Sequence, residues 1–133
     1  LADTTGMANP AQVKRLFTRA IAAVGIERLG AAHMHNTRGL GIANCLAAYD
    51  VGIRGFDTSM AGLGGCPHAP GASGNVVTED LAFMFEAMGI QTGVDISKLI
   101  AARQALMEGL PGEPLYGMTP DAGLPKGWAL TST

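Results

Sequence analysis

Residues 29–50 read LGAAHMHNTRGLGIANCLAAYD and set the pattern for the whole chain. The compact run 29–35 favours a buried strand, and residues from 39 or 40 to about 50 favour a helix. A second short strand is expected over 53–58, and a further helix follows over 78–89. Strands that alternate with helices predict parallel βαβ units, so that a doubly wound sheet and a (β/α)8 barrel are both open at this stage.

Two other helices frame this pattern. Over 10–24 apolar residues recur at helical spacing, with Asn9 as the N-cap, Pro10 at the first helical position and Gly25 as the stop. The other is expected over 95–108. For the helix over 78–89, Thr78 is the expected cap. Residues 110–133 hold four of the seven prolines without periodicity, which predicts an extended tail.

The composition excludes several classes of protein. Of 133 residues, 47% are hydrophobic and 15% are charged, and the formal net charge is −2. Lysines and arginines form no run longer than the pair Lys14 and Arg15, which argues against nucleic acid or an anionic membrane surface as a partner. No apolar run approaches the roughly 20 residues that span a bilayer. Two cysteines are too few for a disulfide framework, so we expect a reduced, cytoplasmic setting.

The clearest chemical signal is HMHN at 33–36. Side chains two apart on a strand point to the same face, so His33 and His35 are placed to bind one metal ion. The alternative is a hydrogen-bonded core histidine. A rival site is Gly39-Leu-Gly41 at a helix start with Asp57 beyond it, which nearly fits a dinucleotide fingerprint but lacks the third glycine at Asn44.

The glycine-rich stretch AGLGGCPHAPGASGN at 61–75 also carries chemistry. Gly64 and Gly65 permit close approach of the backbone to a ligand, and Cys66 beside them is a candidate nucleophile or proton donor. His68 is interpreted as a rim residue. Asn75 offers either a helix cap or an amide oxygen for a cation.

The first strand fragment ends at Asp3, which in a barrel faces the mouth. Asp3 is therefore a candidate base or metal partner, with a turn-capping role as the alternative. The chain begins LADTTG without a Met, and we expect a fragment of a longer protein.

Taken together, ADTTG at 2–6, HMHNTRGLGIAN at 33–44 and AGLGGCPHAPGASGNVVTEDL at 61–81 resemble the 3-hydroxy-3-methylglutaryl-CoA lyases of the metal-dependent lyase and aldolase superfamily. The resemblance implies an α/β fold in which residues 1–109 are about the last three βα units of a TIM (β/α)8 barrel, with 110–133 as a tail. A barrel usually needs about 250 residues, so the first half would be missing here.

The resemblance also implies roles for individual residues. His33 and His35 would be metal ligands, and Asn75 would give an amide oxygen to the same ion, which suits Mg²⁺ or Mn²⁺. Cys66 would protonate the product enolate, and Asp3 would take part in proton transfer at the substrate hydroxyl. The expected partners are an acyl-CoA substrate and a second copy of the protein in a homodimer, and the expected reaction forms acetoacetate and acetyl-CoA.

The sequence departs from the family pattern at several positions. Asn36 replaces the usual aspartate, and His68 stands where an aromatic residue is common. The arginine and the acidic residues that the family takes from its first two strands are absent, so these 133 residues alone are expected to be inactive. Alternatives are a citramalate or isopropylmalate synthase, a hydroxy-oxovalerate aldolase, and a non-catalytic nucleotide-binding module.

Overall fold

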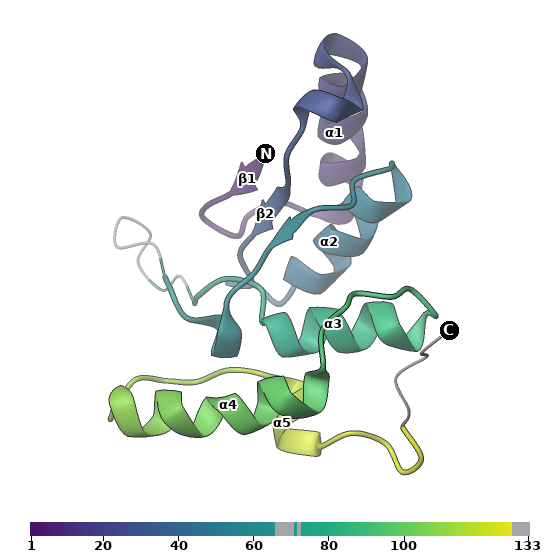
Figure 1. The fold of residues 1–133 in the computed structure, drawn as a ribbon. Helices are drawn as coiled ribbons and strands as arrows, with labels where there is room; N and C mark the ends of the chain where they lie inside the picture. Colours follow the sequence, from purple (N-terminus) through teal and green to yellow (C-terminus); the bar gives the residue numbers. More distant parts are fainter. Residues whose placement is uncertain (66–70, 72, 129–133) are drawn as a thin grey trace.

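The computed structural model of the protein describes residues 1–65, 71 and 73–128. Strands and helices alternate through the first half and helices dominate the second (Figure 1). The elements in chain order are β1 (Ala2–Asp3), α1 (Pro10–Val24), the 3-10 turn η1 (Ile26–Arg28), β2 (Ala32–Met34), α2 (Gly41–Asp50), β3 (Phe56–Asp57), the 3-10 turn η2 (Met60–Gly62), α3 (Thr78–Ala87), α4 (Ile96–Gly109) and α5 (Met118–Ala122).

The three strands form one parallel sheet in the order β1-β2-β3. Ala2 pairs with His33 across β1 and β2, and His33 pairs with Asp57 across β2 and β3. Sequential parallel strands joined by helices are the arrangement that the sequence pattern predicts, and the prediction of an α/β fold with βα units is confirmed.

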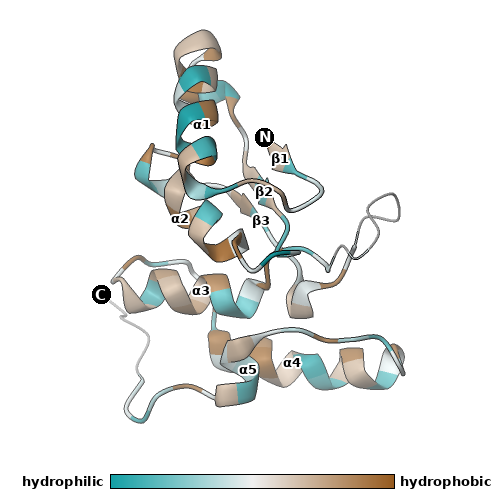
Figure 2. Ribbon diagram, turned by 180° about the vertical axis from the view of Figure 1, so that it is seen from behind, coloured by the Kyte–Doolittle hydropathy of each residue, from teal (hydrophilic) through white to brown (hydrophobic). Residues whose placement is uncertain are grey.

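Helices α1 and α2 lie on the same side of the strands, as both views of the ribbon show (Figures 1 and 2). The core between them and the sheet contains Phe17 from α1, Cys45 from α2, and Ala32 and Met34 from β2, all at most 2% exposed. Since side chains alternate along a strand, His33 and His35 point to the opposite side of the sheet from Ala32 and Met34. The helices therefore bury one face of β2 and leave the other for chemistry.

The start of α1 follows the prediction closely. Asn9 is the N-cap: its side chain accepts a hydrogen bond from the Gln12 N–H at 3.0 Å, and the Gln12 side chain accepts one from the Asn9 N–H at 3.1 Å. This reciprocal capping box satisfies two backbone donors that the helix itself cannot pair. Pro10 occupies the first turn and Gly25 ends the helix, as predicted.

Two predictions about the second half were wrong. Thr78 does not cap α3; it is the first helical residue, Val77 stands at the cap, and the Thr78 hydroxyl donates to the Thr58 hydroxyl at 2.8 Å. The tail is not simply extended, because α5 forms within it and the Asp80 carboxylate accepts hydrogen bonds from the N–H groups of Met118 and Thr119. A tertiary contact overrides the local pattern in both cases.

No helix in the described part of the chain is long and apolar enough to cross a membrane.

Candidate metal centre

The carboxyl end of β2 brings two imidazoles together. The Nε2 atoms of His33 and His35 lie 3.2 Å apart, and the ring centroids lie 5.2 Å apart with a tilt of 50°. The two residues are separated by Met34 and so occupy the same face of the strand. The structure thus confirms the juxtaposition that HMHN predicts, and it turns both Nε2 atoms toward a common point.

The surroundings of His35 favour its neutral form. His35 is only 5% exposed. Burial lowers the pKa of His35, and the nearby His33 lowers it further, while the negative charge of Asp3 acts in the opposite direction. A neutral imidazole is the protonation state that binds metals, so burial favours the ligating state of His35.

Asn75 is brought to the same place by the returning end of the glycine-rich stretch. The segment pairs with the end of β2: the Val76 N–H donates to the Met34 carbonyl at 3.0 Å, and His35 and Asn75 face each other in an antiparallel bridge. The three residues implied as ligands therefore lie next to one another, although 40 residues separate His35 from Asn75.

The amide of Asn75 is oriented by the backbone of the stretch's first part. Its Nδ2 donates to the carbonyls of Leu63 at 2.8 Å and Gly64 at 3.2 Å. Its Oδ1 is buried and has no hydrogen-bond partner in the described structure. A buried acceptor without a donor is costly, and a cation is one partner that removes that cost. Two imidazoles and a free amide oxygen therefore fit a divalent ion.

Asp57 is a neighbour of this site that the sequence did not predict, because there it was considered only as part of a dinucleotide fingerprint. Its Oδ2 lies 3.7 Å from His33 Nδ1, the ring nitrogen opposite the one that faces His35. A carboxylate hydrogen-bonded behind a ligating imidazole orients the ring, and Asp57 lies near that position without making a hydrogen bond. The signal in the sequence was its position at the end of β3, beside His33 in the strand register.

Asp3 has a different environment. Its two carboxylate oxygens accept hydrogen bonds from the N–H groups of Met7 and Ala8, each at 3.0 Å, and in the strand register it pairs with Met34. The turn-capping role is thus present. Its catalytic role stays a prediction.

The glycine-rich stretch is described only in part. Gly64 and Gly65 are exposed, and Gly64 has φ +95°, which favours glycine. Cys66 and His68 lie outside the described residues. Across residues 1–65, 71 and 73–128, no three His, Cys, Asp or Glu side chains gather as a metal cluster. The candidate ligands in this part of the chain are two histidines and one amide.

The rival site has a structural explanation. A Cβ added at Gly41 would lie 2.5 Å from Val76 Cγ2, so glycine is needed there for close packing of α2. The Gly41 N–H already donates to Asn36 Oδ1 at 2.9 Å. An asparagine thus serves the start of α2 where a nucleotide phosphate would have to bind.

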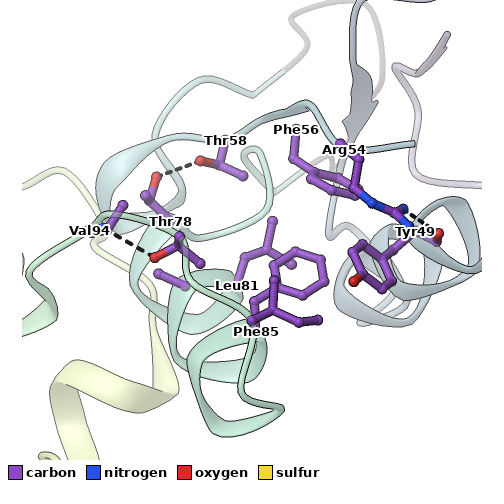
Figure 3. A pocket seen from close by; sticks show the side chains of 11 residues that line it. Tyr49, Arg54, Phe56, Thr58, Thr78, Leu81, Phe85 and Val94 are labelled. Atoms are coloured by element: carbon purple, nitrogen blue, oxygen red, sulfur yellow. Dashed lines mark hydrogen bonds between the residues drawn. The ribbon is translucent and has the colours of Figure 1, made fainter. Parts of the chain in front are cut away.

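A separate apolar pocket lies between α2, β3 and α3, with a cavity of about 230 Å³ (Figure 3). Tyr49, Phe56 and Phe85 form its aromatic wall. Arg54 lies over the Tyr49 ring and donates to the Tyr49 and Ile53 carbonyls. Arg54 Nη1 and the hydroxyls of Thr58 and Thr78 are already paired within the protein, and most of the other lining residues are apolar.

Parallel βα units with a histidine pair at a strand's carboxyl end define the class: a segment of a barrel enzyme whose site is built where the strands end. The chain belongs to the HMGL-like family, which matches residues 1–106.

Individual relatives agree. The chain is 47% identical over 123 residues to (R)-citramalyl-CoA lyase of Chloroflexus aurantiacus and 46% identical over 115 residues to hydroxymethylglutaryl-CoA lyase of Bacillus subtilis, covering 92% and 86% of this chain but 38% of each relative. A solved HMG-CoA lyase from Acinetobacter baumannii, in complex with coenzyme A and 3-methylmalate, superposes with a TM-score of 0.87 at 50% identity, over 97% of this chain and 42% of that one. The fold is thus part of the TIM barrel of these lyases, and the chain spans about two fifths of their length.

Proposed function

We propose that the protein carrying this sequence is a divalent-metal-dependent carbon–carbon lyase that cleaves 3-hydroxy-3-methylglutaryl-CoA to acetoacetate and acetyl-CoA. The observation that carries the proposal is the pair of Nε2 atoms of His33 and His35, 3.2 Å apart, on the strand end to which Asn75 is bridged with its Oδ1 unpaired. Membership of the HMGL-like family and the named relatives support the choice of reaction class. An acyl-CoA substrate is supported by the coenzyme A bound in the Acinetobacter relative.

His33 Nε2, His35 Nε2 and Asn75 Oδ1 would hold the ion, and Mg²⁺ or Mn²⁺ suits a mixed imidazole and oxygen set. Such an ion supplies Lewis acidity toward the substrate's hydroxyl and carbonyl oxygens. Asp57, 3.7 Å from His33 Nδ1, would complete a carboxylate–imidazole–metal arrangement on closing to hydrogen-bond distance. Substrate oxygens and water would complete the coordination.

The proton transfers fall to two side chains. Removal of the proton from the C3 hydroxyl lets the carbon–carbon bond break, so that the hydroxyl carbon becomes the ketone of acetoacetate and the bonding electrons pass to the thioester enolate. Cys66 Sγ then donates a proton to the enolate carbon, and Asp3 takes part in removing the hydroxyl proton. Residues 1–109 supply the last βα units of the barrel, 110–133 form the tail, and the active protein is a homodimer.

The test uses the full polypeptide that carries these residues. Metal-free protein is titrated with Mn²⁺, and acetoacetate release from 3-hydroxy-3-methylglutaryl-CoA is measured. We expect His33→Ala and His35→Ala each to weaken Mn²⁺ binding by more than about 100-fold and to abolish product release, since each removes a ligand. His68→Ala is the matched control, because it removes the one other histidine of the chain. Mn²⁺ binding that survives both substitutions would refute the proposal.

A second substrate is favoured by the (R)-citramalyl-CoA lyase relative. Citramalyl-CoA carries its hydroxyl in the same relation to the thioester, so the same bond cleavage gives acetyl-CoA and pyruvate. Comparing kcat/KM for the two thioesters, with acetoacetate and pyruvate measured separately, assigns the substrate. Pyruvate as the dominant product would replace the first substrate by the second without affecting the metal site.

A further inference from the structure

A buried ion pair lies behind the glycine-rich stretch and takes no part in the site described above. Glu79, in the first turn of α3, is 0% exposed, and its Oε1 accepts a hydrogen bond from Arg103 Nη1 of α4 at 2.8 Å. The Arg103 side chain is 10% exposed. A pair this deeply buried is weak evidence for stability by itself, because removing both charges from water is costly. The other hydrogen bonds of Glu79 connect the ion pair to the glycine-rich stretch.

Both oxygens of Glu79 also accept from the N–H of Ala61, at 3.2 and 3.1 Å. Ala61 has φ +56°, and among the described residues it is the one non-glycine with positive φ. An L-residue keeps such a conformation only when its surroundings impose it. The tail adds a second tie, since the Tyr116 N–H donates to the Ala61 carbonyl at 2.9 Å and Arg103 Nη1 donates to the Tyr116 carbonyl at 2.9 Å.

Ala61 lies two residues before Leu63, whose carbonyl orients the Asn75 amide together with that of Gly64. Gly62 follows it, and the backbone there is so close to Gly74 that a Cβ on Gly74 would lie 1.4 Å from the Gly62 oxygen. The next two carbonyls, of Leu63 and Gly64, hold Asn75 Nδ2. A continuous series of short contacts therefore runs from Arg103 and Glu79 through Ala61 to the amide of Asn75.

We propose that Glu79, supported by Arg103, is a positioning residue for Asn75: by fixing the Ala61 N–H it fixes the Leu63 and Gly64 carbonyls, and through them it turns Asn75 Oδ1 toward the divalent cation. This inference rests on the metal site of the proposed function. A purely structural pair would join α3 to α4 and leave cation affinity unchanged, so that the two roles give different results.

The experiment compares two double variants in the full polypeptide, neither of which leaves a buried charge. Glu79→Gln with Arg103→Met removes the ion pair but keeps an amide oxygen within reach of the Ala61 N–H. Glu79→Leu with Arg103→Met removes that acceptor as well. The control is Lys14→Met, which breaks an exposed ion pair with Asp50 of similar length, 2.7 Å. The readouts are the Mn²⁺ dissociation constant from the spin-resonance signal of free Mn²⁺, amide exchange of the peptide containing 61–64, and thermal unfolding.

We expect the glutamine variant and the control to bind Mn²⁺ within about threefold of the wild type, and the leucine variant to bind it about tenfold or more weakly. In the leucine variant alone, amide exchange at 61–64 accelerates while thermal unfolding stays that of the glutamine variant. If leucine prevents folding, Glu79→Ala with Arg103→Met takes its place with the same expectation.

Equal Mn²⁺ affinity in the leucine and glutamine variants would overturn the positioning role. The ion pair would then serve only to join α3 to α4. Failure of the proposed function looks different. In that case the wild type itself shows no Mn²⁺ binding that depends on His33 and His35.

Discussion

The two halves of the metal site are held in different ways. His33 and His35 stand on β2, which is paired on both sides by strands and packed by α1 and α2 through apolar side chains. Asn75 stands on a returning segment that pairs with the end of β2 through backbone hydrogen bonds, and its amide is oriented by two hydrogen bonds to the carbonyls of Leu63 and Gly64. The positions of the two histidines depend on burial that is spread over many residues, whereas the orientation of the Asn75 amide depends on a few polar contacts.

The largest expected effect tests the packed half. Burial raises the pKa of the Cys45 thiol to about 12, and the residue is 0% exposed. At pH 8 its reactive thiolate is about a thousandth as abundant as that of a free cysteine, so we expect alkylation by iodoacetamide to be slower by about 1,000-fold or more. The measurement is made in a Cys66→Ser background, with and without urea. Rapid labelling without urea would show that this half is not closed.

The same thiol gives a pH dependence. The unfolded chain releases the Cys45 proton near pH 9.0, whereas the folded protein keeps it to about pH 12. The folded state thus binds more protons between these values, and stability falls as the pH rises through that window. Below pH 9.0 the thiol makes no difference. Urea unfolding of the Cys66→Ser and the Cys45→Ala, Cys66→Ser proteins should show this alkaline loss only where Cys45 is present.

A smaller effect is expected where the second half is broken. Gly74→Ala places a Cβ against the Gly62 oxygen and forces the two arms of the glycine-rich stretch apart. We expect Mn²⁺ affinity to fall by about 100-fold. Gly30→Ala is the matched control, because a Cβ there meets nothing within 4 Å and its φ is not positive.

The comparison is sharpened by measuring both halves in the same variant. In Gly74→Ala, Cys45 should stay protected from alkylation while the metal is lost. Exposure of Cys45 in that variant would mean that the two halves fold as one unit and that the contrast between them is wrong.

The smallest expected effect is at the start of α1. Asn9→Ala removes the capping box and should lower the free energy of unfolding by about 1 kcal/mol without changing Mn²⁺ affinity. Urea unfolding followed by circular dichroism gives the first quantity. Asn9→Ser keeps a capping oxygen and serves as the control. A loss of metal affinity on Asn9→Ala would show that the cap supports the site.

Features encoded by neighbouring residues could be predicted from the sequence. Asn9, Pro10 and Gly25 predict the bounds of the helix over 10–24. The common face of His33 and His35 follows from the two-residue period of a strand. The family resemblance then placed Asn75 beside them, and the antiparallel bridge to His35 agrees.

What failed was decided by partners far away in the chain. Thr78 has the sequence of a cap, but its hydroxyl bonds to Thr58. Glu79 looked like an ordinary acid of a first helical turn, and nothing local reveals that Arg103, two dozen residues later, neutralises it. The 3-10 turn that carries Ala61 with its positive φ also has no local signal, because alanine ordinarily avoids that conformation.

The contact between Tyr116 and Ala61 bears on how such proteins diverge. The family match ends at residue 106, yet the Tyr116 backbone touches the turn from which the ligand-orienting carbonyls follow. A hydrogen bond between two backbone groups does not depend on the side chain at either residue. The sequence of the tail can therefore change while this contact is kept. We therefore expect insertions and deletions before Tyr116 to be tolerated less well than substitutions, which makes tail length the quantity to compare among relatives.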